Sequence, residues 1–254
     1  MSIVLDVKAI SKTFGGVKAV DGVSFSVAAG ELLALIGPNG AGKTTCFNML
    51  NGQQRPDSGD VYLGGQQITG LAPRVVAHRG VGRTFQITAT YGSMTVRENV
   101  QTALIASHRG EWKLTGSAAD QHGDKADQLL DLVGMKDQAA RACGVLAYGD
   151  LKRVELAVAL ANEPRLLLMD EPTAGMAPSE RIALMDLAAQ IARSRSIAVL
   201  FTEHDMDVVF AHASRVIVLD RGRLIAQGTA DEVRANPQVQ SVYLGSGATY
   251  GEAH

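Results

Sequence analysis

A glycine-rich loop near the start of the chain has the residue types and spacing needed to hold phosphate groups. It matches the pattern G-x-x-x-x-G-K-[ST], and it follows an apolar run at residues 31–36 that predicts a buried strand. The loop consists of Gly37, Pro38, Asn39, Gly40, Ala41, Gly42, Lys43 and Thr44. Glycines let successive backbone N–H groups converge on one anion, while Lys43 is expected to reach the β- and γ-phosphates and Thr44 to bind Mg²⁺. The loop therefore predicts a nucleoside triphosphate site.

A second group of chemically capable residues follows another apolar run. Residues 166–169 are apolar, and Asp170 and Glu171 come directly after them. Sheets of α/β proteins place their chemistry at the carboxyl ends of the strands. Asp170 suits the water-mediated shell of Mg²⁺, and Glu171 is placed to polarise an attacking water. Two acids after a strand are common in proteins, but together with the phosphate loop they predict hydrolysis of the bound nucleotide.

Alternating strands and helices are expected to position these two groups. Apolar patterns predict strands at residues 3–10, 20–27, 31–36, 59–63, 82–86, 165–170, 197–202, 215–220 and 223–226. The first of these strands is expected to end in a turn at residues 11–16. Helices are predicted at residues 43–50, 150–161, 178–193 and 205–212, with a helical stretch at 95–133 that a polar segment interrupts. The fold class is therefore α/β: a P-loop core with a mostly parallel sheet, an N-terminal antiparallel β region and an inserted α-helical region.

Composition limits the partners and the compartment. The 254 residues carry 24 basic and 26 acidic side chains, a net charge of −2, which gives no general attraction to nucleic acid or to an anionic membrane. The apolar runs are shorter than the ~18 residues that span a bilayer, and the N-terminus lacks the layout of a signal peptide. Cys46 and Cys143 lack metal-type spacing and are expected to be reduced core residues.

Three further segments decide which class of nucleotide-binding protein this is. Gln86 ends a predicted strand, residues 146–150 precede a predicted helix, and His204 follows a predicted strand. In this order, the chain resembles the ATP-binding cassette (ABC) ATPases over nearly its whole length. Phe14 resembles the family's aromatic A-loop residue, Gln86 its Q-loop glutamine and His204 its H-loop histidine. Residues 37–44 resemble Walker A, 146–150 the signature motif, 166–171 Walker B and 174–177 the D-loop.

The resemblance implies ATP and Mg²⁺ as ligands and assigns roles to individual residues. Glu171 would activate water, His204 would contact the γ-phosphate and orient Glu171, and Gln86 would meet the metal or the water as a third catalytic residue. The implied metal ligands are Thr44, Gln86 and Asp170. The residues implied to bind ATP are Phe14, which would stack on adenine, and Gly37, Pro38, Asn39, Gly40, Ala41, Gly42, Lys43, Thr44, Thr45, Ala147 and Gly149.

The signature motif departs from the family pattern at two positions. Ala147 replaces the usual serine and Asp150 the usual glutamine, so the Gly149 backbone and the helix after it are expected to carry the contact to phosphate. The D-loop ends in Ala177, where the family commonly has an aspartate. In the family two cassettes dock head to tail, so Gly149 would face the γ-phosphate that another subunit holds through its own lysine.

The resemblance also implies an organisation for the chain. Residues 1–254 would form a single ABC ATPase domain. Within it, residues 1–86 and 163–254 would make up a RecA-like core with its β subdomain, and residues 87–162 a helical signature subdomain.

The resemblance is closest to the ATPases of branched-chain and hydrophobic amino acid uptake. The segments that carry it are residues 82–86, 146–150, 202–206 and 236–245. It implies a peripheral subunit on the cytoplasmic face of the cell membrane, with two permease subunits, a second ABC ATPase subunit and, indirectly, a secreted solute-binding protein. The second ATPase could be a copy of this chain or a related cassette, and the branch favours the latter. An exporter ATPase and a soluble cassette acting on nucleic acid remain alternatives, although the charge balance favours no nucleic acid.

Overall fold

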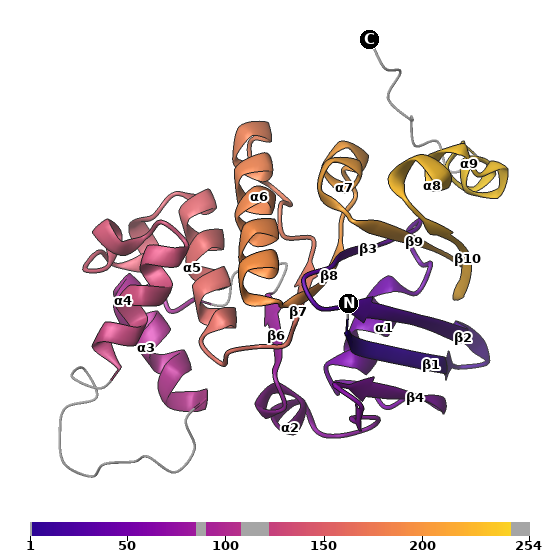
Figure 1. Cartoon of the computed structure of the whole chain (residues 1–254), viewed down its shortest axis with the longest axis horizontal. Coiled ribbons are helices and arrows are strands. Elements are labelled where there is room, and N and C mark those ends of the chain that lie inside the picture. Colours follow the sequence, from indigo (N-terminus) through magenta and orange to yellow (C-terminus); the bar gives the residue numbers. More distant parts are fainter. Residues whose placement is uncertain (1, 85–89, 108–121, 245–254) are drawn as a thin grey trace.

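Two β-sheets with helices around them build the molecule (Figure 1). The computed structural model describes residues 2–84, 90–107 and 122–244. One sheet has the strand order β2-β1-β4-β5, and the other has the order β10-β9-β3-β8-β7-β6. The first sheet consists of β1 (Ile3–Phe14), β2 (Val17–Ala28), β4 (Ser58–Leu63) and β5 (Gln66–Gln67). The second consists of β3 (Leu32–Ile36), β6 (Val81–Thr84), β7 (Leu166–Asp170), β8 (Ala198–Thr202), β9 (Arg215–Asp220) and β10 (Arg223–Gly228).

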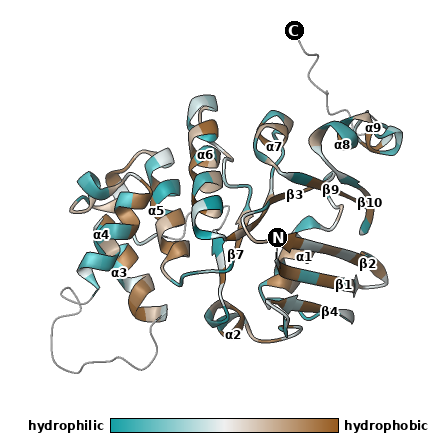
Figure 2. Ribbon diagram, in the orientation of Figure 1, coloured by the Kyte–Doolittle hydropathy of each residue, from teal (hydrophilic) through white to brown (hydrophobic). Residues whose placement is uncertain are grey.

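The central strands of the six-stranded sheet are buried on both faces, which explains why β3, β7, β8 and β9 are almost continuously apolar. Strands β6, β7, β8, β3 and β9 pair in parallel, and β10 pairs antiparallel with β9 at the edge. All five residues of β3 are fully buried. Leu33 packs into one hydrophobic cluster and Ala34 into another, so alternate residues serve the two faces. In Figure 2 the visible parts of β3 and β7 are mostly brown, whereas α4 and α6 show both brown and teal segments.

The N-terminal hairpin is longer than the sequence pattern predicts. Residues 11–16 were expected to form a turn, but β1 continues to Phe14 and the turn is confined to Gly15 and Gly16. Asp57, from a distant segment, accepts hydrogen bonds from Lys12 Nζ at 2.7 Å and from Thr13 N at 2.8 Å. These bonds supply partners that local sequence does not reveal, and they keep the end of β1 extended.

The predicted helices are confirmed with small shifts in their bounds. They are α1 (Lys43–Leu50), α3 (Val96–Ser107), α4 (Gly123–Leu132), α5 (Tyr148–Leu160), α6 (Pro178–Arg195) and α7 (Met206–His212). Short elements that the periodicity did not predict are α2 (Pro73–His78), α8 (Ala230–Ala235), α9 (Pro237–Leu244) and the 3₁₀ turns η2 (Lys136–Gln138) and η3 (Cys143–Val145). A sequence signal existed for α8, since Thr229 and Glu232 form a capping box at its start.

Helices α3, α4 and α5 pack against one another at one end of the molecule, as the predicted helical insertion requires (Figure 1). The division into a core at residues 1–86 and 163–254 and a subdomain at 87–162 stays a prediction. Both cysteines are fully buried, and burial raises the pKa of Cys46 to about 12, as expected for unreactive core thiols. Within the described ranges, no helix has the length and apolar character to cross a membrane.

Candidate active site

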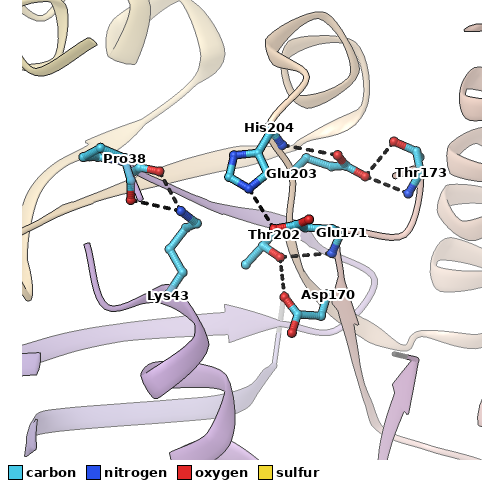
Figure 3. A network of polar contacts seen from close by, with 9 residues as sticks. Pro38, Lys43, Asp170, Glu171, Thr173, Thr202, Glu203 and His204 are labelled. Carbon is cyan, nitrogen blue, oxygen red and sulfur yellow. Dashed lines mark hydrogen bonds and ion pairs between the residues drawn. The ribbon is translucent and has the colours of Figure 1, made fainter. Parts of the chain in front are cut away.

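The strand order brings the predicted site residues to one edge of the six-stranded sheet. Strand β8 lies between β3 and β7, and the three strands run parallel. Their carboxyl ends are therefore adjacent. The phosphate loop follows β3, Asp170 and Glu171 lie at the end of β7, and His204 follows β8. Figure 3 shows these groups facing a common space.

Two glycines let the phosphate loop pack closely against its neighbours. Gly37 has a φ of 152°, and a Cβ there would lie 2.2 Å from the carbonyl oxygen of Leu219 in β9. Gly42 has a φ of 104°, and its Cβ would lie 2.3 Å from the carbonyl oxygen of Ala19 in β2. Any other residue would push the loop away from β9 at position 37 or away from β2 at position 42, so the two glycines fix its curvature.

Lys43 is buried inside the loop. The side chain of Lys43 donates from Nζ to the carbonyl oxygens of Gly37 at 2.7 Å and Pro38 at 3.2 Å, and the residue is 8% exposed (Figure 3). Burial lowers the pKa of the Lys43 ammonium, whereas the carboxylates of Glu171 and Asp170 raise it. The ammonium is thus already folded into the loop and close to the acid pair. Phosphate oxygens could replace the two carbonyls without moving the charge far.

The two acids have different surroundings. Asp170 accepts a hydrogen bond from the Thr202 hydroxyl at 2.8 Å on Oδ1 and forms an ion pair with Arg83 at 3.2 Å on Oδ2. Glu171 has a φ of 47°, in the left-handed region that residues other than glycine rarely adopt. Such backbone strain concentrates at functional sites, where the surroundings enforce it. Here the Glu171 N–H donates to the Thr202 hydroxyl and carbonyl oxygens, both at 3.1 Å.

Glu171 and His204 contact each other directly. His204 Nε2 lies 2.7 Å from Glu171 Oε1, and the histidine side chain is 53% exposed (Figure 3). The structure therefore joins the predicted water-activating acid to the histidine predicted to orient it. A pocket is lined by His204 on one side and by Gly37, Pro38 and Asn39 of the phosphate loop on the other.

The remaining predicted nucleotide contacts lie on three elements. Phe14 is 45% exposed at the end of β1, on the same hairpin whose β2 strand packs on Gly42. Thr44 and Thr45 occupy the first turn of α1, with Thr44 exposed and Thr45 half-buried. Gln86 lies outside the described residues.

The signature residues lie away from the phosphate loop, on the helical side of the molecule (Figure 1). Ala147 is exposed as the N-cap of α5, and no side chain of the described part of the chain caps this helix end. Gly149 is buried, and a Cβ added there would lie 2.9 Å from Glu180 Oε1 at the start of α6. The described chain therefore does not bring both halves of the predicted ATP site together.

Several residues that support the site were not singled out from the sequence. Arg83 bridges Asp170 to Asn48 Oδ1 at 3.1 Å and Gln53 Oε1 at 3.0 Å. Thr202, at the end of β8, serves both Asp170 and Glu171. The one available signal was position, since polar residues at the ends of apolar strands meet at this edge of the sheet.

The parallel sheet, the phosphate loop before α1 and the acid pair at the end of β7 are the features of a P-loop nucleotide hydrolase. The chain belongs to the ABC transporter family, whose profile matches residues 20–174. A second profile, described as branched-chain amino acid ATP-binding cassette transporter, matches residues 223–249. The prediction of an ATP-hydrolysing transporter subunit is thereby confirmed.

Comparison with known proteins agrees over nearly the full length. The chain is 37% identical over 252 residues to the high-affinity branched-chain amino acid transport ATP-binding protein BraF of Pseudomonas aeruginosa, covering 95% of this chain and 98% of that protein. Its fold matches MJ1267, an ATP-binding cassette of an ABC transporter in its ADP conformation, with a TM-score of 0.87, 32% identity and coverage of 96% and 100%. The dimeric structure of MJ0796, a bacterial ABC transporter cassette, matches with a TM-score of 0.76, 25% identity and coverage of 89% and 98%.

Proposed function

We propose that this chain drives import of branched-chain or other hydrophobic amino acids by hydrolysing ATP on the cytoplasmic face of the cell membrane. The observation that carries the proposal is the near full-length similarity to BraF, together with an ATP site whose phosphate loop, acids and histidine lie at one sheet edge. Permeases and a secreted binding protein would select the solute. An exporter subunit and a cassette acting on nucleic acid are less well supported, because neither explains this similarity.

The chain's own groups suffice to hold the triphosphate. The backbone N–H groups of the loop and the first turn of α1 point a positive dipole end at the phosphates, and Lys43 would exchange its carbonyl partners for β- and γ-phosphate oxygens. Phe14 would stack on the adenine ring. Lys43 itself is buried, and its ammonium would make charge-assisted contacts to phosphate that are stronger than neutral hydrogen bonds.

Thr44 and Asp170 offer a hydroxyl and a carboxylate, the hard oxygen ligands that suit Mg²⁺, so the residues present fit this ion. When bound, Mg²⁺ neutralises charge on the β- and γ-phosphates. Gln86 is the further ligand that the family pattern assigns. Thr202 and Arg83 hold the two oxygens of Asp170, so the carboxylate is already oriented before the nucleotide arrives.

Hydrolysis requires a water aligned with the γ-phosphate. Glu171 would accept a hydrogen bond from this water and polarise it, while His204, which lies 2.7 Å from the Glu171 carboxylate, would hold it and contact the γ-phosphate. Phosphoryl transfer passes through a loose transition state, so positioning and charge neutralisation supply most of the rate. The chain would provide both through the residues that follow β3, β7 and β8.

The second half of the site would come from another ABC ATPase subunit. The uncapped N-terminus of α5, with Ala147 and Gly149, suits a γ-phosphate held by a partner's Lys43. Its distance from this chain's own loop and the dimeric arrangement of MJ0796 support this assignment. The partner is a copy of this chain or, as the branch favours, a related cassette.

Uptake measurements test the proposed cargo. Cells lacking this chain are expected to lose most high-affinity uptake of radiolabelled leucine, and expression of the wild-type chain should restore it. Expression of a Lys43→Ala chain should not restore leucine uptake, because the charge-assisted contact to phosphate is lost. Uptake of labelled glucose serves as the control. Unchanged leucine uptake in the deletion strain would exclude this cargo.

An exposed surface beside α3 supports docking of a permease segment. Tyr91 is 60% exposed and Val145 is 66% exposed, and they are neighbours because Gly144 N donates to the Gly92 carbonyl oxygen at 2.9 Å. Asn99 ties this turn to α3, because its Oδ1 accepts a hydrogen bond from Tyr91 N at 2.8 Å and its Nδ2 donates to Tyr91 O at 3.2 Å. An exposed aromatic and aliphatic pair of this kind is typical of protein contacts. We infer that a short cytoplasmic permease helix lies here.

A cysteine cross-link tests this docking surface, since both native cysteines are buried. Cysteines are introduced into the cytoplasmic segments of the permease, and membranes that contain the whole transporter are treated with a short bifunctional thiol reagent. A Tyr91→Cys chain is expected to form an adduct with the permease. Ile3→Cys, equally exposed at 57% but on β1, should give none. A permease adduct from Ile3→Cys alone would place the docking surface elsewhere.

A further inference from the structure

Glu203 is a buried carboxylate that the mechanism above does not use. It lies between Thr202 and His204 and is 4% exposed. Its Oε1 accepts hydrogen bonds from the Thr173 hydroxyl at 2.7 Å and from Thr173 N at 2.9 Å, and its Oε2 accepts one from His204 N at 3.3 Å (Figure 3). Thr173 is 1% exposed, so this group of contacts is closed to solvent.

A carboxylate in such surroundings is costly unless it is fully hydrogen-bonded. Burial raises the pKa of Glu203, and the nearby charge of Glu171 acts in the same direction. The three hydrogen bonds oppose both effects because they favour the ionised form. An apolar residue would fill this space without that cost, so the carboxylate must do something that packing alone does not require.

The contacts of Glu203 join the two segments that carry the catalytic pair. Thr173 comes two residues after Glu171, and His204 follows Glu203 directly. One carboxylate therefore ties the backbone beyond the end of β7 to the backbone beyond the end of β8. Farther from the site, Arg181 joins the same segments, with Nε donating to the Met176 carbonyl oxygen at 2.8 Å and Nη1 contacting Asp205 at 2.6 Å.

We propose that Glu203 is a positioning residue, which sets the separation of Glu171 and His204 for hydrolysis by clamping Thr173. This inference rests on the proposed roles of Glu171 and His204. Because a misplacement of about 1 Å at a reacting centre costs roughly 10²-fold in rate, loosening the clamp lowers kcat. The affinity for ATP depends on the loop around Lys43, whereas the hydrogen bonds of Glu203 go to Thr173 and His204, so KM and the dissociation constant stay nearly constant.

A series at Thr173 tests the clamp without removing the buried charge. Thr173→Val keeps the shape but loses the hydroxyl donor, and it is expected to lower kcat of the full chain about 10-fold. Thr173→Ser keeps the donor and should restore kcat to within about 2-fold of the wild type, so the conservative variant rescues the function. Binding of a fluorescent ATP analogue should change by less than about 2-fold in both variants.

Glu203→Ala is expected to lower kcat by roughly 10²-fold, again with nearly unchanged nucleotide affinity. Combining it with Thr173→Val should add little, because both changes break the same contact. Thr69→Val is the matched control, because the Thr69 hydroxyl accepts a hydrogen bond from Val61 N at 2.8 Å beside the N-terminal sheet. This variant should lose stability without losing kcat. Thermal unfolding of every variant separates misfolding from loss of rate, and the Thr173 series stands even where Glu203→Ala does not fold.

Equal kcat for Thr173→Val and the wild type would overturn the clamp, as would equal losses in Thr173→Ser and Thr173→Val. A parallel loss of nucleotide affinity and kcat would also contradict it. Failure of the proposed function itself has a different signature, because Glu171→Gln would then turn over ATP normally. An inactive Glu171→Gln together with a fully active Glu203→Ala would overturn only the clamp.

Discussion

Glu171→Gln is expected to lower steady-state ATP hydrolysis by roughly 10²–10⁴-fold, the contribution of a positioned general base. The amide keeps the shape of the side chain but cannot accept a proton from water. ATP binding should remain near normal, because Lys43 and the loop around it are unchanged. Phosphate release measures the first effect and titration calorimetry with ATP and Mg²⁺ the second. The variant should also accumulate an ATP-bound dimer with its partner subunit, since the step that separates the subunits is blocked.

A matched variant distinguishes the site from a general loss of charge. Glu163 has a side chain that is 70% exposed and pairs with Lys125, away from the sheet edge that carries the site. Glu163→Gln removes the same charge and should hydrolyse ATP at the wild-type rate. Near-normal turnover by Glu171→Gln would contradict the role of Glu171 in activating water. An equal loss of turnover in both variants would indicate an indirect effect of the lost charge.

Gly149→Trp is expected to abolish hydrolysis while leaving ATP binding by the single chain nearly normal. A Cβ at position 149 would lie 2.9 Å from Glu180 Oε1, and Glu180 also accepts a hydrogen bond from Ala177 N, so a larger side chain displaces this carboxylate at the start of α6. The indole would thereby distort the N-terminus of α5, which is expected to face the partner's γ-phosphate. Lys43→Ala should show the reverse pattern, with weakened nucleotide binding from the start. Calorimetry and phosphate release on both variants separate these two losses.

Mixing the two variants tests whether the site is shared. If the chain pairs with itself, Gly149→Trp and Lys43→Ala subunits together restore one intact site in each dimer, and part of the turnover should return. If it pairs with a related cassette, the mixture stays inactive until that cassette is added. Normal hydrolysis by Gly149→Trp as a monomer contradicts a shared site.

The parts of the site that the sequence predicts depend on residues that lie close together along the chain. The phosphate loop combines a buried strand, two sterically required glycines and a helix start within a short segment, so pattern and structure agree from Leu32 to Leu50. Asp170 and Glu171 follow a fully apolar strand, which marks the carboxyl end of a buried parallel strand. The parallel sheet then brings His204 to Glu171, as the family resemblance implied.

The unpredicted part depends on contacts between distant segments. Thr173 and Glu203 are 30 positions apart, and Arg83 and Asp170 are 87 positions apart. The extension of β1 depends on Asp57, 44 positions beyond Thr13. The pattern of apolar and polar residues does not predict such pairs, because each pair depends on which strands become neighbours in the sheet. Only the strand order of the folded chain reveals them.

A structure of the Glu171→Gln chain with ATP and Mg²⁺ tests the central claim most directly, through the contacts of the Lys43 ammonium. In the structure this group lies 2.7 Å from the Gly37 carbonyl oxygen and 3.2 Å from that of Pro38. With ATP bound, it should leave both carbonyls and lie within hydrogen-bond distance of the β- and γ-phosphates, with the side chain at position 171 facing a water beside the γ-phosphate. A triphosphate bound elsewhere, with Lys43 still on its two carbonyls, would contradict the account.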